Sequence, residues 1–136
     1  MSARTKARKR ALDILFAADV RQISVSEALA SEAARAASEP QRETSWLYAR
    51  DIVDGVIDHQ AEIDETIETY AQGWTLARMP AVDRGLLRIA VWEIMYNDEV
   101  PPSVAISEAV EAAGLLSTDD SSGFVNGVLG KIAQSV

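Results

Sequence analysis

The sequence contains no cysteine and only one histidine, His59. These absences exclude a disulfide scaffold, a thiolate zinc site, an iron–sulfur cluster and a cysteine nucleophile, and they leave too few imidazoles for a histidine-rich metal centre. No apolar run approaches the ~20 residues that are needed to cross a bilayer. We therefore expect a cytoplasmic protein that uses no metal, no cofactor and no membrane.

The familiar enzyme motifs are missing as well. The sequence has no glycine-rich phosphate loop, no paired-histidine metal motif and no nucleophile elbow. His59 lies at an expected helix junction, where a capping role is favoured over catalysis because no motif places a nucleophile near it. The four acidic residues between positions 62 and 68 lack the spacing of a calcium loop, so a solvated helix face explains them better. We expect no catalytic residue.

A basic N-terminus precedes an acidic remainder. The chain has 136 residues, of which 48% are hydrophobic, which is enough for one domain with a packed core. Its net charge is −8, yet the first ten residues include five basic side chains and no acidic one. This basic N-terminus consists of Arg4, Lys6, Arg8, Lys9 and Arg10. Such a cluster is typical of a contact with a polyanion, although a solvated terminus explains it equally well.

Hydrophobic spacing predicts an all-α protein. Alanine occurs 22 times, and no run of β-branched residues alternates with the period of two that a half-buried strand requires. The first helix is expected over about residues 5–22. Its buried stripe should include Leu12, Leu15 and Phe16, whereas Arg8 and Lys9 should lie beyond the end of the buried part.

Local signals divide the rest of the chain into six further helices. The second helix is expected to begin at the capping box Ser24-Val25-Ser26-Glu27 and to end near residue 37. A break is expected between residues 58 and 60, and Gly73 should end the fourth helix, before a turn or short helical piece. The first or capping residues expected for the third, fifth, sixth and seventh helices are Pro40, Pro80, Ser103 and Thr118.

Three aromatic residues lie outside the expected core pattern: Tyr70, Trp74 and Phe124. Each ring, taken alone, is better explained as a core residue. Together with the basic N-terminus, they match the pairing that holds single-stranded RNA, with cations on phosphates and rings on unstacked bases. Phe124 is the most suggestive ring, since Gly123 and Gly127 would let a base approach it closely.

Four blocks of the sequence resemble the NusB family of transcription antitermination factors. They occur in the family's order and spacing and cover nearly the whole chain. The blocks are Ala7–Leu12 with Leu15 and Phe16, Ala81–Arg88 followed by Glu93, Val100–Val110, and Phe124–Leu129 preceded by Asp119–Ser122. Each block alone is a weak signal, but four linked blocks are specific.

The resemblance implies an all-α fold of seven helices in two roughly perpendicular bundles. A single domain over residues 1–136 would divide into halves of about residues 1–73 and 74–136. The implied function is non-catalytic. It is the binding of single-stranded boxA RNA from ribosomal RNA leaders, jointly with the ribosomal protein NusE, within the antitermination complex of RNA polymerase. A homodimer that hides the RNA surface stays open.

Matching motifs assign expected RNA contacts. Arg8, Arg10 and Phe124 match RNA-contact positions of the family. The other three cations of the basic N-terminus join them because of their charge, and Tyr70 is a weaker candidate because its segment aligns poorly with the family. Ser107, Gly114 and Gly123 depart from the family pattern, and Gly114 and Gly123 lie where lysine is common. Phosphate binding is therefore expected to depend more heavily on the basic N-terminus.

The same comparison assigns residues to the surface that binds NusE. Asp83 and Arg84 match positions on the family's central helix, and Asp120 precedes its C-terminal signature. Asp83 is expected to be exposed, because it falls in the first turn after Pro80. Trp74 is a weaker candidate for this surface. Two alternatives stay open: a NusB-like domain cut from a ribosomal RNA cytosine methyltransferase, and a helical interaction module that does not bind RNA.

Overall fold

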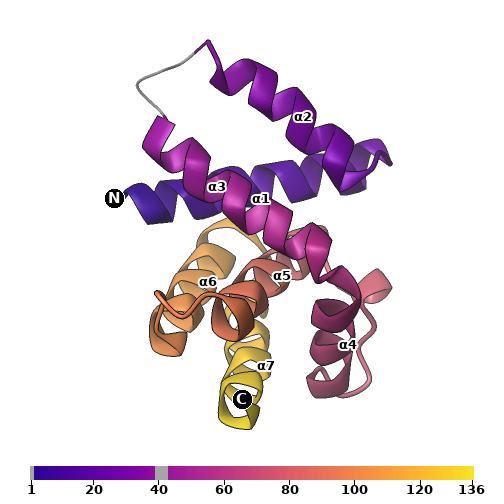
Figure 1. Ribbon diagram of the computed structural model, residues 1–136. Helices are drawn as coiled ribbons and strands as arrows, with labels where there is room; N and C mark the ends of the chain where they lie inside the picture. Colours follow the sequence, from indigo (N-terminus) through magenta and orange to yellow (C-terminus); the bar gives the residue numbers. More distant parts are fainter. Residues whose placement is uncertain (1, 39–42) are drawn as a thin grey trace. The chain divides into compact units, whose positions relative to one another are not determined.

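The computed structural model describes residues 2–38 and 43–136, and these residues are largely helical (Figure 1). They form seven α-helices, one short 3₁₀ helix and no strand. The elements are α1 (Ala3–Arg21), α2 (Val25–Ala36), α3 (Glu43–Asp58), α4 (Gln60–Tyr70), η2 (Leu76–Arg78), α5 (Ala81–Tyr96), α6 (Pro102–Leu116) and α7 (Ser121–Ser135). The all-α class and the seven helices expected from the sequence are confirmed, and the perpendicular arrangement of the two bundles stays a prediction.

The chain divides into two compact units, which we call the first unit (Met1–Asp58) and the second unit (His59–Val136). The division coincides with the predicted helix break, since α3 ends at Asp58 and α4 begins at Gln60. It falls earlier than the division near residue 73 that was expected from the sequence. The reason is that α4 packs against α5, α7 and η2 and so belongs to the second unit.

In the first unit, α1 packs against both α2 and α3 (Figure 1). Its buried face includes three alanines, Ala7, Ala11 and Ala18, which lie on one side of the helix. These small residues shift the centre of the buried face away from Phe16, which is 40% exposed. The prediction that Phe16 is buried is therefore wrong, because a pattern of large apolar residues overlooks alanine.

The predicted helix starts are confirmed in two cases and corrected in two. Pro80 directly precedes α5 and is its N-cap residue, as expected. Ser24 Oγ accepts a hydrogen bond of 3.0 Å from the Glu27 N–H, as expected for the N-cap of α2. Ser103 does not cap α6, which begins at Pro102, where the missing N–H of proline loses no hydrogen bond. Thr118 does not cap α7, which begins at Ser121. Pro40, the expected start of the third helix, lies outside the described residues.

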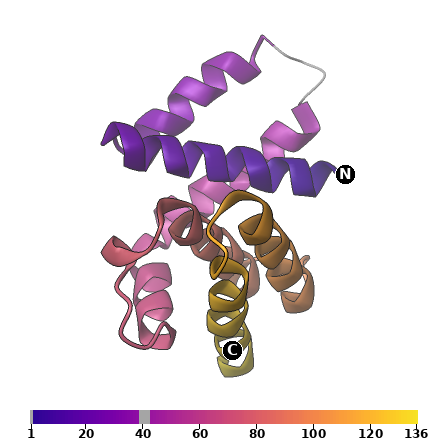
Figure 2. The same ribbon diagram turned by 180° about the vertical axis from the view of Figure 1, so that it is seen from behind.

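The core of the second unit is built around α5, which packs against α4, α6 and α7. Seen from behind, α6 and α7 lie side by side (Figure 2). Leu86, Leu87 and Ile89 are buried, as predicted for the central helix. The two oxygens of Asp64 accept hydrogen bonds of 2.9 and 3.1 Å from Arg88, so a two-bond ion pair joins α4 to α5.

The turn after α4 depends on glycine. Gln72 and Gly73 both have positive φ angles, 46° and 89° respectively. The left-handed region costs an L-residue roughly 1–2 kcal/mol, whereas glycine adopts it freely. This turn ends at Trp74, whose N–H donates a hydrogen bond to the carbonyl of Ala71. The backbone conformation of Gly73 therefore determines where the Trp74 ring emerges.

Two glycine substitutions should have opposite effects on the free energy of unfolding. Gly73→Ala should lower it by about 1–2 kcal/mol, because the new residue is held at a positive φ. Gly130→Ala should raise it by about 1 kcal/mol, because a Cβ there meets no atom within 4 Å and alanine favours a helix. Urea denaturation measures both effects. Equal stability of the Gly73→Ala variant and the parent would contradict the strain at this turn.

Candidate nucleic-acid interface

The structure separates the five residues of the basic N-terminus into buried and exposed cations. All five lie within α1, which begins at Ala3. Arg4, Lys6 and Lys9 are exposed and Arg10 is half-buried, but Arg8 is only 9% exposed. The prediction that Arg8 lies beyond the buried part of the helix is wrong. The buried face of α1 already begins at Ala7, one residue earlier.

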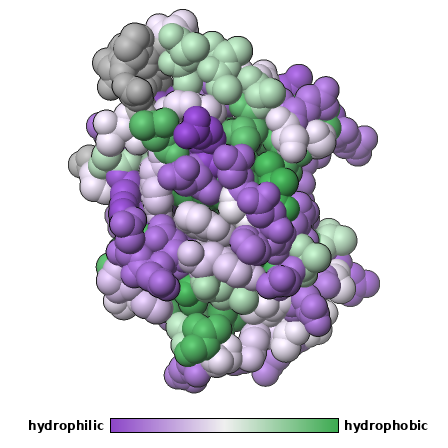
Figure 3. Space-filling model, viewed as in Figure 1, coloured by the Kyte–Doolittle hydropathy of each residue, from purple (hydrophilic) through white to green (hydrophobic). Residues whose placement is uncertain are grey.

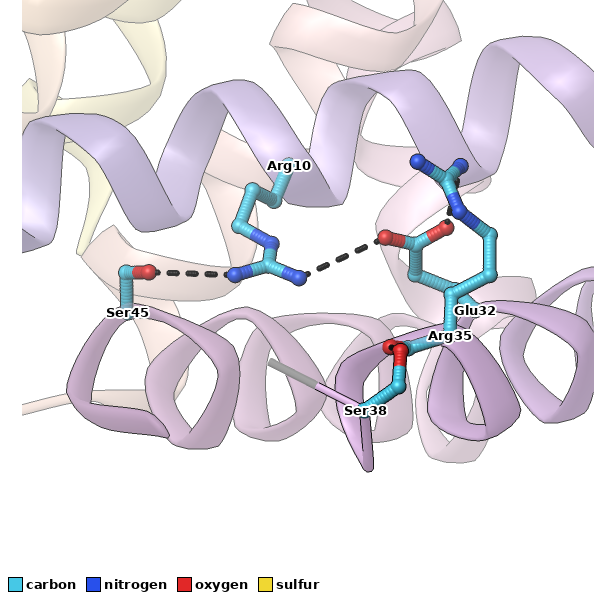
Figure 4. Close-up of polar contacts among 5 residues, drawn as sticks. All are labelled: Arg10, Glu32, Arg35, Ser38 and Ser45. Carbon is cyan, nitrogen blue, oxygen red and sulfur yellow. Dashed lines mark hydrogen bonds and ion pairs between the residues drawn. The ribbon is translucent and has the colours of Figure 1, made fainter. Parts of the chain in front are cut away.

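Arg10 points toward neighbouring side chains of the first unit (Figure 4). Its Nη1 donates to Ser45 Oγ at 3.3 Å, its Nη2 lies 3.4 Å from Glu32 Oε1, and its guanidinium lies 5.8 Å from the Trp46 ring centroid. Glu32 also pairs with Arg35 at 3.1 Å. These contacts connect α1 to α2 and α3. Arg10 therefore stabilises the first unit, and its charge is partly neutralised there.

The exposed cations of α1 remain accessible to a ligand. The Arg4 guanidinium lies 5.0 Å from the centroid of the Tyr48 ring, a distance at which a cation and a ring attract each other. Lys9 Nζ forms an exposed ion pair with Asp13 at 2.7 Å, one turn along the helix. Pairs of this kind contribute only about 0.3–0.5 kcal/mol, so a phosphate can replace the carboxylate. Lys6 is exposed as well.

Two of the three singled-out aromatic rings meet in the second unit. The centroids of Trp74 and Phe124 are 6.1 Å apart and their planes form an angle of 63°, which is an edge-to-face arrangement. Trp74 is 50% exposed and Phe124 is half-buried. Tyr70, the third ring, is half-buried near the end of α4. The structure thus joins a ring from the loop after α4 to a ring in α7.

Asp83 is buried, which corrects the expectation that it is exposed. Its side chain is 2% accessible, and its carboxylate accepts hydrogen bonds from the hydroxyls of Ser117 and, at 2.9 Å, Ser121. Thr118 Oγ1 lies 2.8 Å from Ser121 Oγ and extends this hydroxyl network. The network connects the first turn of α5 to the end of α6 and the start of α7. Asp83 therefore orients the helix that carries Phe124 and cannot present its charge to a partner.

The other two residues expected to face NusE differ from each other. Arg84 is half-buried, and its Nη1 donates to the backbone carbonyls of Leu76 at 2.7 Å and Met79 at 3.4 Å. It therefore fixes η2 to α5. Asp120 is exposed and forms the N-cap of α7, where a negative charge is favoured by the helix dipole. Of the three motif-derived candidates, Asp120 alone is exposed.

The exposed surface has features that the sequence motifs did not indicate. Hydrophilic residues predominate on the face seen in Figure 3, with hydrophobic ones among them. Leu115 is 77% exposed and Leu116 is 42% exposed at the end of α6. Lys131 is exposed and lies seven residues after Phe124, which places it on the same face of α7. Extending the helical spacing beyond the family signature, which ends at Leu129, would have identified Lys131.

His59 and the neighbouring acidic residues have structural partners. His59 lies at the junction of α3 and α4, as predicted, and stacks on Tyr96 with centroids 3.8 Å apart. The Tyr96 hydroxyl donates to Glu62, and this bond, with burial and the nearby negative charge, raises the pKa of Tyr96 to about 12. Glu68 accepts a hydrogen bond from the Leu76 N–H. The acidic residues of α4 thus hold structure as well as facing solvent.

Two negative findings concern the described residues only. No group of three or more histidine, aspartate and glutamate side chains within residues 2–38 and 43–136 is arranged to hold a metal ion. Among the helices of that part of the chain, none combines the length with the apolar character that crossing a membrane requires.

The hydroxyl network around Asp83 can be tested by substitution. Asp83→Ala should lower the free energy of unfolding by about 2–3 kcal/mol, because it removes the charged acceptor of two buried or half-buried hydroxyls. Asp120→Ala is the matched control, since this exposed carboxylate should contribute less than about 1 kcal/mol. Urea denaturation gives both values. Similar losses in the two variants would mean that the network adds little stability.

The described residues combine an all-helical fold with exposed cations on α1 and an aromatic pair in the second unit. The model of the NusB family matches residues 5–134, and the chain belongs to this family. It is 78% identical to the transcription antitermination protein NusB of Leifsonia xyli subsp. xyli (strain CTCB07), covering 99% of this chain and 94% of the relative. It is 62% identical to the protein of the same name from Clavibacter sepedonicus, covering 98% and 97%.

Solved structures show the same fold. NusB from T. maritima has a TM-score of 0.81 at 29% identity, covering 96% of this chain and 90% of that one. A structure of the antitermination factors NusB and NusE in complex with dsRNA has a TM-score of 0.84 at 26% identity, covering 100% and 99%. Because the relatives are matched over nearly their whole length, the similarity is to entire NusB proteins. The alternative of a methyltransferase domain is therefore not favoured.

Proposed function

We propose that this protein is a non-catalytic transcription antitermination factor that binds boxA RNA of ribosomal RNA leaders together with NusE. The observation that carries the proposal is the match over nearly the whole chain to proteins named transcription antitermination protein NusB. The similarity to a NusB solved with NusE and RNA supports both partners. The Arg88–Asp64 ion pair and the Ser121–Asp83 hydrogen bond join helices to one another, a structural role that fits a binding protein.

On the RNA side, α1 supplies the phosphate contacts. Arg4, Lys6 and Lys9 are exposed on one rigid helix, so their spacing is fixed before the RNA arrives. Cations that neutralise phosphates release counterions, and this release drives binding of any RNA sequence. Arg8 and Arg10 match RNA-contact positions of the family in the sequence. Arg8 is buried and the half-buried Arg10 pairs with Glu32, which favours a supporting role for both.

Recognition of a single strand also requires contacts with bases. Sequence-specific RNA recognition mostly targets unstacked bases, which stack on aromatic side chains. Phe124 lies in the first turn of α7 and is half-buried, so one part of its ring packs inside and another part can face RNA. Tyr70 is a weaker candidate for the same role. It is half-buried and does not belong to the Trp74–Phe124 pair.

On the protein side, the second unit has the charge that a basic partner requires. It contains four basic and twelve acidic side chains, whereas the first unit contains nine of each. An acidic surface attracts a basic ribosomal protein and speeds their association. Asp120 belongs to this acidic surface, because it is exposed and the family motif assigns it to NusE binding. We infer that assembly with RNA polymerase follows from the complex with NusE and RNA. A homodimer of the free protein would hide the RNA surface.

The phosphate contacts can be tested with labelled boxA RNA at several salt concentrations. A variant with Arg4→Ala and Lys6→Ala should bind more weakly, and the slope of log K against log salt should become shallower by roughly 1.4, which is two single-strand phosphate contacts. Arg10→Ala is the control, because it should lower the melting temperature of the protein with little change in the slope. An unaltered slope in the double variant would argue against α1 as the phosphate-binding element.

The NusE surface can be tested by charge reversal. Asp120→Lys should weaken NusE binding about tenfold or more in titration calorimetry, because it places a like charge against a basic partner. Asp98→Lys, at another exposed position of the second unit, should have a smaller effect. Circular dichroism would show whether both variants keep their helices. Equal affinities of the two variants would remove Asp120 from the interface and leave only a general charge effect.

A further inference from the structure

We propose that Trp74 is a base-stacking residue, and that Trp74 and Phe124 together hold one unstacked nucleobase. This inference rests on the proposed RNA-binding function and deepens it by adding a residue and a ligand class. It also reassigns Trp74, which was expected from the sequence to lie on the surface that binds NusE. The observation that motivates it is the meeting of the two rings with half of Trp74 still exposed.

The ring geometry leaves a stacking surface available. In an edge-to-face pair, the edge of one ring covers one face of the other, so the pair retains uncovered ring faces. Trp74 is 50% exposed, so a large part of its ring is accessible to a ligand. Stacking of a base on such a ring contributes to affinity and tolerates any base, because every base has a flat π-face.

The loop that carries Trp74 is held through Leu76, whose N–H and carbonyl both form hydrogen bonds with charged side chains. The N–H of Leu76 donates to Glu68 Oε2 at 2.8 Å, and its carbonyl accepts from Arg84 Nη1 at 2.7 Å. Leu76 itself is buried. Two charged side chains, one from α4 and one from α5, therefore hold the backbone two residues after Trp74. A ring presented in this way loses little conformational freedom when a ligand binds.

The neighbouring surface of α7 favours a nucleotide over a protein segment. Gly127 follows Phe124 by one turn, is exposed, and has no atom within 4 Å of the position that a Cβ would take. Lys131 follows by a second turn, roughly 10 Å along the helix from Phe124. The Phe124 ring, the open surface at Gly127 and the cation of Lys131 therefore lie along one face of α7. A base on the rings and the phosphate of an adjoining nucleotide near Lys131 would match this order.

The charge of the second unit predicts how this contact responds to salt. Since acidic side chains outnumber basic ones there, the contact depends on stacking and not on a field of cations. The loss of a ring should consequently lower RNA affinity without changing its salt dependence. The cations of α1 should show the opposite behaviour, because their contribution comes from phosphate neutralisation.

The test uses the full-length protein and a set of boxA RNAs in which one base at a time is removed to leave an abasic position. Trp74→Ala should weaken binding of the intact RNA by about 5- to 100-fold at an unchanged salt slope. Trp74→Phe should retain most of the affinity. One abasic position that weakens binding to the parent protein should have little further effect on Trp74→Ala, because the ring that held that base is gone.

A second variant tests the same face without removing a packed ring. Gly127→Leu places a side chain over the open surface between Phe124 and Lys131. The fold should be kept, because leucine favours a helix more than glycine does. It should weaken RNA binding several-fold. Ser107→Leu, which adds the same side chain at an exposed position of α6, is the matched control and should bind RNA like the parent.

The outcomes separate the inference from the proposed function. If the parent binds boxA RNA and both Trp74→Ala and Gly127→Leu bind it equally well, the inference is overturned and the proposed function stands. Weakened NusE binding with normal RNA binding in Trp74→Ala also overturns it, in favour of a protein contact. If Trp74→Ala fails to fold, Gly127→Leu and Trp74→Phe decide. A parent that binds no boxA RNA, with or without NusE, refutes the proposed function itself.

Discussion

The carboxylate of Asp83 lies in the first turn of α5 and accepts hydrogen bonds from hydroxyls at the end of α6 and the start of α7. A charge that is 2% exposed is tolerated only because these bonds satisfy it. The position of α7 depends on this arrangement. Phe124 lies one turn after Ser121 on that helix, so its position depends on the same hydrogen bonds. The aromatic pair, and with it the proposed contact with RNA bases, therefore depends on a buried carboxylate.

The basic N-terminus shows how basic side chains of one helix can serve both folding and binding. Arg8 is buried, and Arg10 bonds to α2 and α3 within the first unit. Arg4, Lys6 and Lys9 leave the same helix toward solvent. Because α1 is a rigid rod, the contacts of Arg10 help to fix the direction of the exposed cations. A substitution in the basic N-terminus therefore acts on stability or on RNA affinity according to its side of the helix.

Local signals in the sequence predicted most of the fold, and long-range packing accounts for the rest. The cap at Ser24, the break after Asp58 and the apolar α5 depend on residues within a few positions, so the sequence shows them directly. The burial of Arg8 and Asp83 depends on packing between helices, which spacing along one helix cannot show. The pairing of Trp74 with Phe124 joins segments fifty residues apart. Each ring was identified, but their contact was not.

The hydrogen bonds on either side of Leu76 each span eight residues of chain. Closing a loop becomes entropically harder with its length, and the difference between eight and fifty residues is about 1.6 kcal/mol. The Trp74 loop is therefore ordered by contacts among α4, η2 and α5, which are near one another in sequence. The contact of Phe124 with Trp74, by contrast, requires the tertiary structure of the whole second unit to form. The two rings of one surface are thus held by different means: Trp74 by short-range contacts, and Phe124 by the tertiary structure around Asp83.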